Sequence, residues 1–173
     1  MPKRLILLER EVLYQEYATQ SEDEFRYIAG TLPILISAPH GASHTRNGKY
    51  KGEDEYTAAF ARLIATETGA HCIYARRKSK TDPNLAEDAP YKEKVREISR
   101  KNKILFAIDL HGMWTHHEAG IELGTREGRS CPRQKALILQ SLKESGFSKK
   151  ITRNYYSCGL IALVNALKLS FDN

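Results

Sequence analysis

Two short, continuous apolar runs constrain the fold of this 173-residue chain more than any other feature. Residues 32–38 and 104–110 each have the length and composition of a buried strand. Helix-like segments lie between these and other strand-like segments, and the connections are short. This alternation predicts an α/β fold, with a mixed, mostly parallel sheet covered by helices on both faces.

The predicted elements follow from periodicity and from turn residues. Strand-like pieces within 5–14 and 24–29 predict an entry hairpin. The remaining pattern predicts strands over 32–38, 71–75, 104–110 and 120–124, and helices over 54–68, 88–101, 132–145 and 160–169. Gly69 and Gly146 are the expected stops of two of these helices. We expect one domain over 1–173.

Composition excludes several classes of protein. No apolar stretch approaches the roughly 20 residues that a membrane-spanning helix needs. The three cysteines form no CxxC pair and no signal-peptide pattern opens the chain, which predicts a reduced, cytoplasmic protein. The net charge of +6 raises nucleic acid as a partner, but the basic stretches 76–80 and 149–153 carry no interleaved aromatic residues. We therefore interpret them first as solvated surface.

Each of the two apolar runs ends at a histidine–glycine pair, His40-Gly41 and His111-Gly112. Ligands of open α/β sheets bind beyond the carboxyl ends of the strands, so both imidazoles are expected in one cleft. Two histidines and a carboxylate are a common ligand set of catalytic zinc. The sequence therefore predicts a metal site.

The third ligand is expected from the acidic segment 53–55, at the start of the predicted helix. Asp54 is a natural N-cap, which leaves Glu55 as the preferred ligand and Glu53 as the alternative, but the choice among the three acidic residues stays open. Asp109 lies two residues before His111 and either orients a ligand or caps a turn.

Four other histidines are weaker candidates. His116 and His117 are rival ligands, but adjacent side chains of an extended segment point apart, so at most one would bind. His44 and His71 are predicted to be structural or exposed.

Six short motifs occur in order between Leu32 and Gly128: Ser37-Ala38-Pro39-His40-Gly41, Asp54-Glu55-Tyr56-Thr57, Thr68-Gly69-Ala70, Asp82-Pro83-Asn84, Tyr91-Lys92 and Asp109-Leu110-His111-Gly112-Met113. Together they resemble the N-formylglutamate amidohydrolase-like family, relatives of zinc carboxypeptidases and succinylglutamate desuccinylase. The resemblance implies a three-layer α/β/α, phosphorylase/hydrolase-like fold and one zinc held by His40, Glu55 and His111. One difference is Ser43, which stands where zinc carboxypeptidases have an acid three residues after the first histidine.

The resemblance also implies a general-base glutamate from a late strand. After Glu144 the only acidic residue is Asp172. Three interpretations stay open: the chain is truncated at its C-terminus, the base comes from elsewhere, or the protein hydrolyses nothing. The candidate substitutes are Glu118, Glu122 and Glu127. Glu122 is preferred because it alternates with apolar neighbours, although an ordinary solvent-facing strand residue has the same pattern.

The expected substrate is a small anionic N-acyl amino acid or peptide. A planar guanidinium matches a carboxylate, and among Arg46, Arg76, Arg77 and Arg126 we prefer Arg46 and Arg77 as substrate-binding residues. Zinc-dependent hydrolysis of an amide bond is the predicted reaction. The alternatives are an inactive metal- or ligand-binding relative and, third, a basic nucleic-acid-binding protein. Whether residues 160–169 pack internally or in a homodimer is left open.

Overall fold

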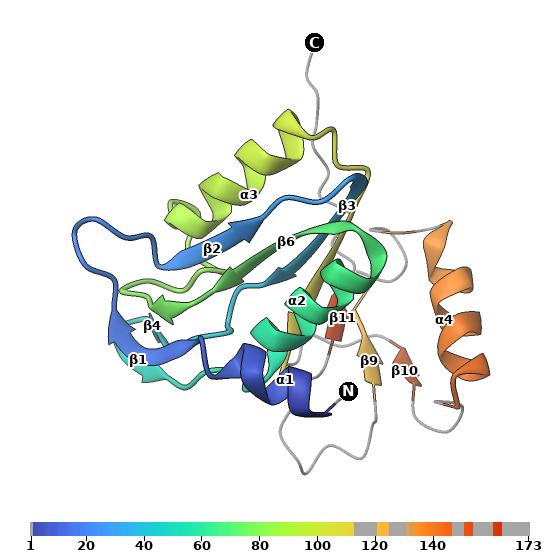
Figure 1. Cartoon of the computed structure of the whole chain (residues 1–173), viewed down its shortest axis with the longest axis horizontal. Helices are drawn as coiled ribbons and strands as arrows, with labels where there is room; N and C mark the ends of the chain where they lie inside the picture. Colours follow the sequence, from blue (N-terminus) through green and yellow to red (C-terminus); the bar gives the residue numbers. More distant parts are fainter. Residues whose placement is uncertain are drawn as a thin grey trace.

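A mixed β-sheet forms the centre of the fold in the computed structural model. The structure describes residues 2–112, 121–124, 131, 133–146, 151–153 and 161–163. Within them the sheet has seven strands in the order β10-β9-β11-β8-β3-β6-β2 (Figure 1). Its central strands β3 (Leu32–Ala38), β6 (Ala70–Ala75) and β8 (Phe106–His111) run parallel.

The outer strands make the sheet mixed. Strand β2 (Phe25–Ile28) is antiparallel to β6, and β11 (Ile161–Leu163) is antiparallel to β8. Strands β9 (Ile121–Leu123) and β10 (Ile151–Arg153) continue the sheet in parallel pairs beyond β11.

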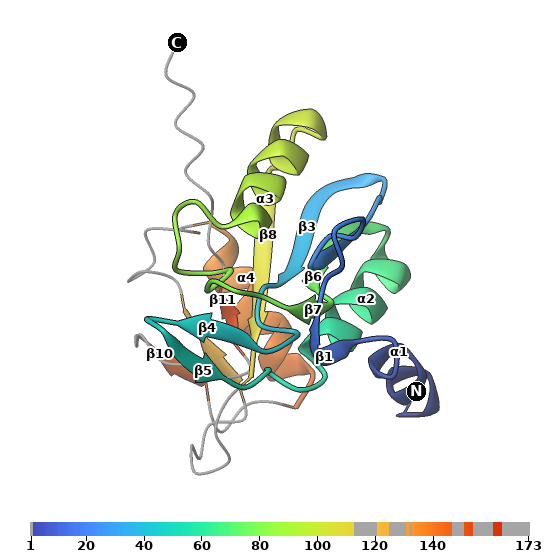
Figure 2. The ribbon, with the colours of Figure 1, turned by 90° about the vertical axis from the view of Figure 1, so that its left-hand side faces the viewer.

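Helices cover both faces of this sheet. Helix α2 (Thr57–Thr68) packs on β3, β6 and β8, and α3 (Pro90–Lys101) lies on the opposite face (Figure 2). Helix α1 (Pro2–Glu9) packs on α2, and α4 (Gln134–Glu144) lies near β9. The predicted α/β class is confirmed. None of the described helices is long and apolar enough to cross a bilayer.

Two small sheets flank one end of the central strands. Strand β1 (Leu13–Tyr17) pairs with β7 (Arg77–Lys78), and β4 (His44–Arg46) pairs with β5 (Lys49–Lys51). An isolated bridge between His44 and Ser79 joins the two.

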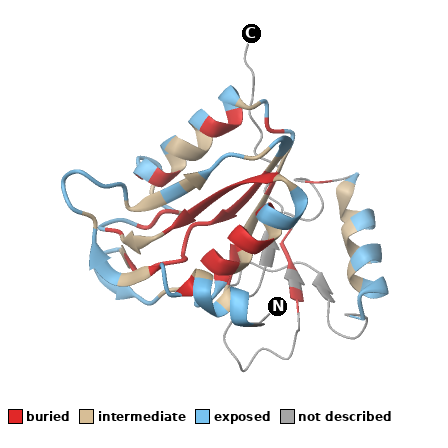
Figure 3. Cartoon of the chain, viewed as in Figure 1, coloured by how far each residue is buried: buried red, intermediate tan, exposed pale blue. Residues whose placement is uncertain are grey.

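Small apolar residues let α2 approach the sheet closely. Ala58, Ala61 and Ala65 of α2 are buried with Leu35 of β3 and Ile73 of β6 (Figure 3). Burial of apolar side chains at this contact stabilises the fold by about 25 cal/mol per Å² of apolar surface. Helix α2 therefore packs directly on β3 and β6.

Two predicted elements differ from the structure. The entry hairpin is wrong, because residues 2–9 form helix α1 and strands β1 and β2 belong to different sheets. A helix over 160–169 is also wrong at residues 161–163, which form strand β11 beside β8. A run of apolar residues satisfies either structure, and in β11 the pairing with β8 decides it.

Candidate metal centre

The structure brings the two predicted histidines together at the carboxyl edge of the sheet. Strands β3 and β8 are adjacent and parallel with Ser37 opposite Asp109, so His40 and His111 emerge at the same edge. Both side chains are buried, and their Nδ1 atoms lie 3.1 Å apart. The planes of the two rings are inclined at 64°, so one point close to both rings can lie in both planes.

The glycine after each histidine allows other elements to approach the site. A Cβ atom on Gly112 would lie 2.9 Å from the Cβ of Asp54, and one on Gly41 would lie 2.8 Å from the Cβ of Ala58. Side-chain carbons do not approach this closely, so any other residue would push the α2 segment away from the sheet. The glycine of each histidine–glycine pair is therefore required by the packing of the α2 segment on the sheet.

The carboxylate that lies beside the two histidines is Asp54 and not the preferred Glu55. Asp54 Oδ2 lies 3.5 Å from His40 Nδ1 and 3.3 Å from His111 Nδ1. Glu55 is exposed, and Glu53 bonds the side chain of Gln15.

The correction has a local cause in the backbone. Helix α2 begins at Thr57, and its N-cap Tyr56 makes no side-chain cap bond. Asp54 therefore does not cap the helix, contrary to expectation. Its backbone N–H donates to the carbonyl of His40 at 2.8 Å, which holds the residue beside the histidine.

These three donor atoms fit a zinc ion. Ligands held at 2.0–2.1 Å from a tetrahedral ion are about 3.3 Å apart, and the three observed separations are 3.1, 3.3 and 3.5 Å. The Oδ2 atom of Asp54 is buried and, among the described residues, has no hydrogen-bond partner. A buried carboxylate oxygen is costly without a partner, and a cation would provide one.

A second carboxylate orients His40 from the opposite side of its ring. Asp82 Oδ1 lies 3.0 Å from His40 Nε2, and the side chain of Asp82 is 4% exposed. A carboxylate at Nε2 places the ring proton there and leaves Nδ1 unprotonated for a metal. Asp82 is in turn held by the backbone N–H groups of Asn84 and Leu85, at 2.8 and 3.1 Å, and by Arg46 Nε at 2.5 Å.

Both carboxylates are ionised despite their burial. Burial raises the pKa of Asp82, but its hydrogen bond with His40 and its contact with His44 outweigh this effect and hold the pKa well below its usual range. Burial also raises the pKa of Asp54, and contacts with His111 and His40 again lower it overall. For His40, burial lowers the pKa, and the two carboxylates raise it above its usual value. The centre therefore concentrates negative charge around His40.

A second His–Asp group, formed by His40, His44 and Asp82, is less suited to a metal. The rings of His40 and His44 stack with centroids 4.3 Å apart and planes 11° apart. A metal binds a histidine nitrogen in the plane of the ring, and two nearly parallel planes share no such point. His44 Nε2 lies 3.4 Å from Asp82 Oδ2, where Arg46 also adds positive charge. We interpret this group as one that orients His40.

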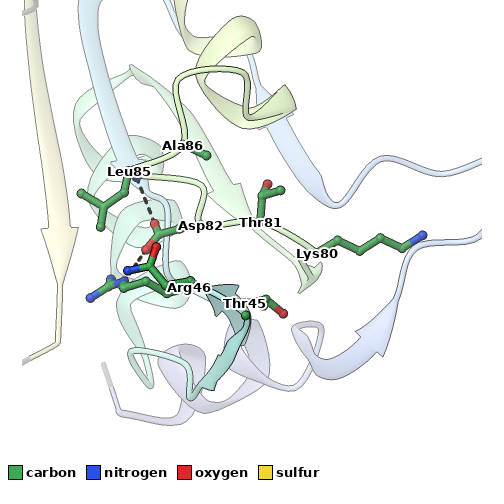
Figure 4. A pocket seen from close by; sticks show the side chains of 9 residues that line it. Thr45, Arg46, Lys80, Thr81, Asp82, Leu85 and Ala86 are labelled. Atoms are coloured by element: carbon green, nitrogen blue, oxygen red, sulfur yellow. Dashed lines mark hydrogen bonds and ion pairs between the residues drawn. The ribbon is translucent and has the colours of Figure 1, made fainter.

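The predicted substrate-binding arginines occupy different surroundings. Arg46 lines an open pocket of about 330 Å³ together with Asp82 and Leu85 (Figure 4). The side chain of Lys80 points in the opposite direction from that of Arg46 (Figure 4). Arg77 lies outside this pocket. Its guanidinium bonds Glu16 at 3.3 Å and Glu22 at 3.1 Å.

The candidate base is only partly described. Glu122 lies in β9, and the register places it opposite Ile161, which in turn is opposite His111. The structure does not describe its side chain. The other residues considered for the site that lie outside the described part of the chain are His116, His117, Glu118, Arg126 and Glu127.

The sequence did not predict the positions that two residues of the site take beside the histidines. Asp82 occurs in one of the six motifs but has no predicted role of its own, and Asp54 is expected to cap a helix. The sequence Asp82-Pro83-Asn84 does indicate that an aspartate side chain folds back on the next backbone N–H groups, as it does here. Nothing in that sequence places the same carboxylate against a histidine 42 residues earlier.

Comparison with known proteins leaves the family open. No family model matches this chain, and no curated protein or solved structure is significantly similar to it. The geometry of the centre is therefore the guide to what this protein does.

Proposed function

We propose that this chain is a zinc-dependent hydrolase that cleaves an amide bond in an N-acyl amino acid or small peptide. The convergence of His40 Nδ1, His111 Nδ1 and Asp54 Oδ2 carries the proposal. Two histidines and one carboxylate leave a coordination position open, as in catalytic rather than structural zinc sites. Zinc held there would polarise a carbonyl group and make a water nucleophilic at neutral pH.

The residues around the ligands preorganise this centre. Asp82 fixes the tautomer and the orientation of His40, and the backbone N–H groups at 84 and 85 fix Asp82. Because His40, His111 and Asp82 are buried, water competes little with these contacts.

Glu122 is the proposed general base. It would take a proton from the attacking water and deliver it to the leaving amine. Its Cα lies two strand spacings from that of His111, or about 10 Å. A glutamate and a histidine side chain together span a separation of this size.

Arg46 is the proposed recognition group for the substrate carboxylate. Its Nε is occupied by Asp82, which fixes the guanidinium at the rim of the pocket. The two terminal nitrogens of such a fixed group suit a bidentate carboxylate. Arg77 is already neutralised by two glutamates, so the proposal rests on Arg46 alone.

The test is release of amine from N-formyl, N-acetyl and N-succinyl amino acids by zinc-loaded protein. We expect chelator-sensitive turnover, abolished by His111→Ala. Glu122→Gln should keep its zinc and lose at least about 100-fold in kcat. The exposed Glu93→Gln on α3 is the matched control and should be fully active.

Other outcomes would contradict the proposal in distinct ways. Stoichiometric zinc without turnover of any of these substrates would favour a metal-binding relative that has no catalysis. Salt-dependent binding of nucleic acid that is indifferent to chelator would favour the third alternative.

A further inference from the structure

We infer that Glu9 is a positioning residue for the metal centre: it holds the turn 54–57 in the conformation that directs Asp54 at His40 and His111. The inference rests on the proposed metal centre and adds a residue from helix α1, far from the motifs that indicated the site. Glu9 and Tyr56 are 47 positions apart in sequence and in direct contact in the structure.

The turn before α2 has a backbone conformation that needs support. Tyr56 has φ 63° and ψ −5°, which is the left-handed region, and a tyrosine is rarely found there. Left-handed conformation costs a residue with a Cβ roughly 1–2 kcal/mol. Contacts from elsewhere in the fold must therefore favour it over the relaxed alternatives.

Glu9 makes the contact that holds Tyr56. Its Oε1 atom accepts a hydrogen bond from the Tyr56 backbone N–H at 2.6 Å, and a second from the hydroxyl of Tyr14. The side chain of Glu9 is buried, which is unusual for a glutamate. Burial and the neighbouring Glu9 carboxyl together raise the pKa of Tyr14. A carboxyl group is seldom buried without a specific partner, and here the partner is the backbone of the turn.

The turn transmits this contact to Asp54. The N–H and the hydroxyl of Thr57 both donate to the Asp54 carbonyl, at 3.2 and 2.6 Å. Gly112 packs directly against Asp54 on its other side. With Asp54 only two residues before Tyr56, a rotation of the Tyr56 backbone would move the carboxylate away from the imidazoles. A shift of about 1 Å is enough to degrade a metal site.

Glu9 could instead serve only to dock α1, and the structure offers a control for that role. Arg62 of α2 also holds α1, by donating to the carbonyl of Leu8 and to the carboxylate of Glu11, both at 2.9 Å. Among the described residues, Arg62 has no hydrogen bond or ion pair with the turn 54–57. Arg62→Met therefore weakens the docking of α1 and leaves the Glu9–Tyr56 bond in place.

The experiment measures zinc affinity by competition with a chromogenic chelator, together with thermal unfolding of each variant. We expect Glu9→Ala to bind zinc about 10-fold more weakly, in the range seen for residues that orient metal ligands. Glu9→Gln keeps an acceptor for the Tyr56 N–H and should stay within about 3-fold of wild type. Arg62→Met should lose thermal stability and keep its zinc affinity.

A second substitution tests the backbone mechanism directly. Glycine adopts the left-handed conformation without a Cβ penalty, so Tyr56→Gly in the Glu9→Ala background should recover most of the lost affinity. If Glu9→Ala does not fold, Glu9→Met fills the same space without an acceptor and replaces it in the comparison.

The results separate this inference from the proposed function. Wild-type protein that binds no zinc would overturn both. Zinc binding by wild type with equal affinity in folded Glu9→Ala would overturn only the role of Glu9. Equal weakening by Arg62→Met, or no recovery with Tyr56→Gly, would show that Glu9 acts through the docking of α1.

Discussion

The two His–Asp groups of this protein share His40 and contain the same kinds of side chain, yet they suit different tasks. In the first group, formed by His40, His111 and Asp54, the ring planes cross at 64° and three donor atoms lie within 3.5 Å of one another. In the second group, the rings of His40 and His44 are stacked with their planes 11° apart, and the two oxygens of Asp82 face the Nε2 atoms of the two rings. The geometry of the first group suits one shared ion, and that of the second suits the orientation of a ring.

The comparison shows that the identity of the residues does not define a metal site. The planes of the imidazoles and the neighbouring charges decide between ligation and orientation. Arg46 beside Asp82 gives that carboxylate a cation already, whereas Asp54 Oδ2 has no hydrogen-bond partner in the described part of the chain. The two nitrogens of His40 therefore serve two different carboxylates.

The largest expected effect is loss of zinc when a ligand of the first group is removed. Asp54→Ala and His111→Ala should each bind zinc at least about 100-fold more weakly than wild type, because two protein ligands do not make a catalytic zinc site. Isothermal titration with zinc measures this, with circular dichroism as the test of folding. Glu55→Gln is the matched control and should bind as wild type does. Strong binding by Asp54→Ala with loss in Glu55→Gln would restore the ligand set predicted from sequence.

A smaller effect is expected from the carboxylate of the second group. Asp82→Asn should weaken zinc binding by about 10- to 100-fold, because the amide no longer fixes the tautomer of His40. The same titration should still give one zinc per chain. A wild-type stoichiometry of two that falls to one in Asp82→Asn would show that the second group is itself a metal site.

The close approach of the α2 segment to β8 can be tested at Gly112. Its replacement by alanine brings a Cβ within 3.1 Å of the Asp54 backbone, so both stability and zinc affinity should fall. Overpacking of this kind costs about 1–3 kcal/mol of unfolding free energy, measurable by urea denaturation. At Gly52 an added Cβ meets only the Tyr50 hydroxyl at 4.0 Å, so Gly52→Ala should be close to neutral. Equal effects of the two substitutions would argue against the packing role.

The smallest expected effect is that of His44. His44→Phe keeps a ring for stacking on His40 and removes both nitrogens, so zinc affinity should stay within about 3-fold of wild type. The chelator competition measures the difference. A loss as large as that of His111→Ala would mean that His44 is a ligand.

Much of the framework of the site could be predicted because it depends on local patterns. The apolar runs gave β3 and β8, and their parallel pairing brought His40 and His111 together as expected. Gly69 ends α2 with φ 79°, a conformation that the sequence also indicated.

The rest of the site depends on contacts that are remote in sequence. Asp54, which lies beside the two histidines, comes two residues before the left-handed Tyr56, whose N–H bonds Glu9, 47 residues away in sequence. The role of Asp82 follows from its contact with His40, which no spacing rule encodes. Propensity favoured Asp54 as a cap, and the tertiary contact with two histidines outweighed it.

Zinc-edge anomalous diffraction from crystals of the zinc-loaded protein tests the central claim most directly. We predict one strong peak, at about 2.0–2.2 Å from His40 Nδ1, His111 Nδ1 and Asp54 Oδ2. A peak between His40 Nε2, His44 and Asp82, or no ordered zinc at this edge of the sheet, would contradict the account.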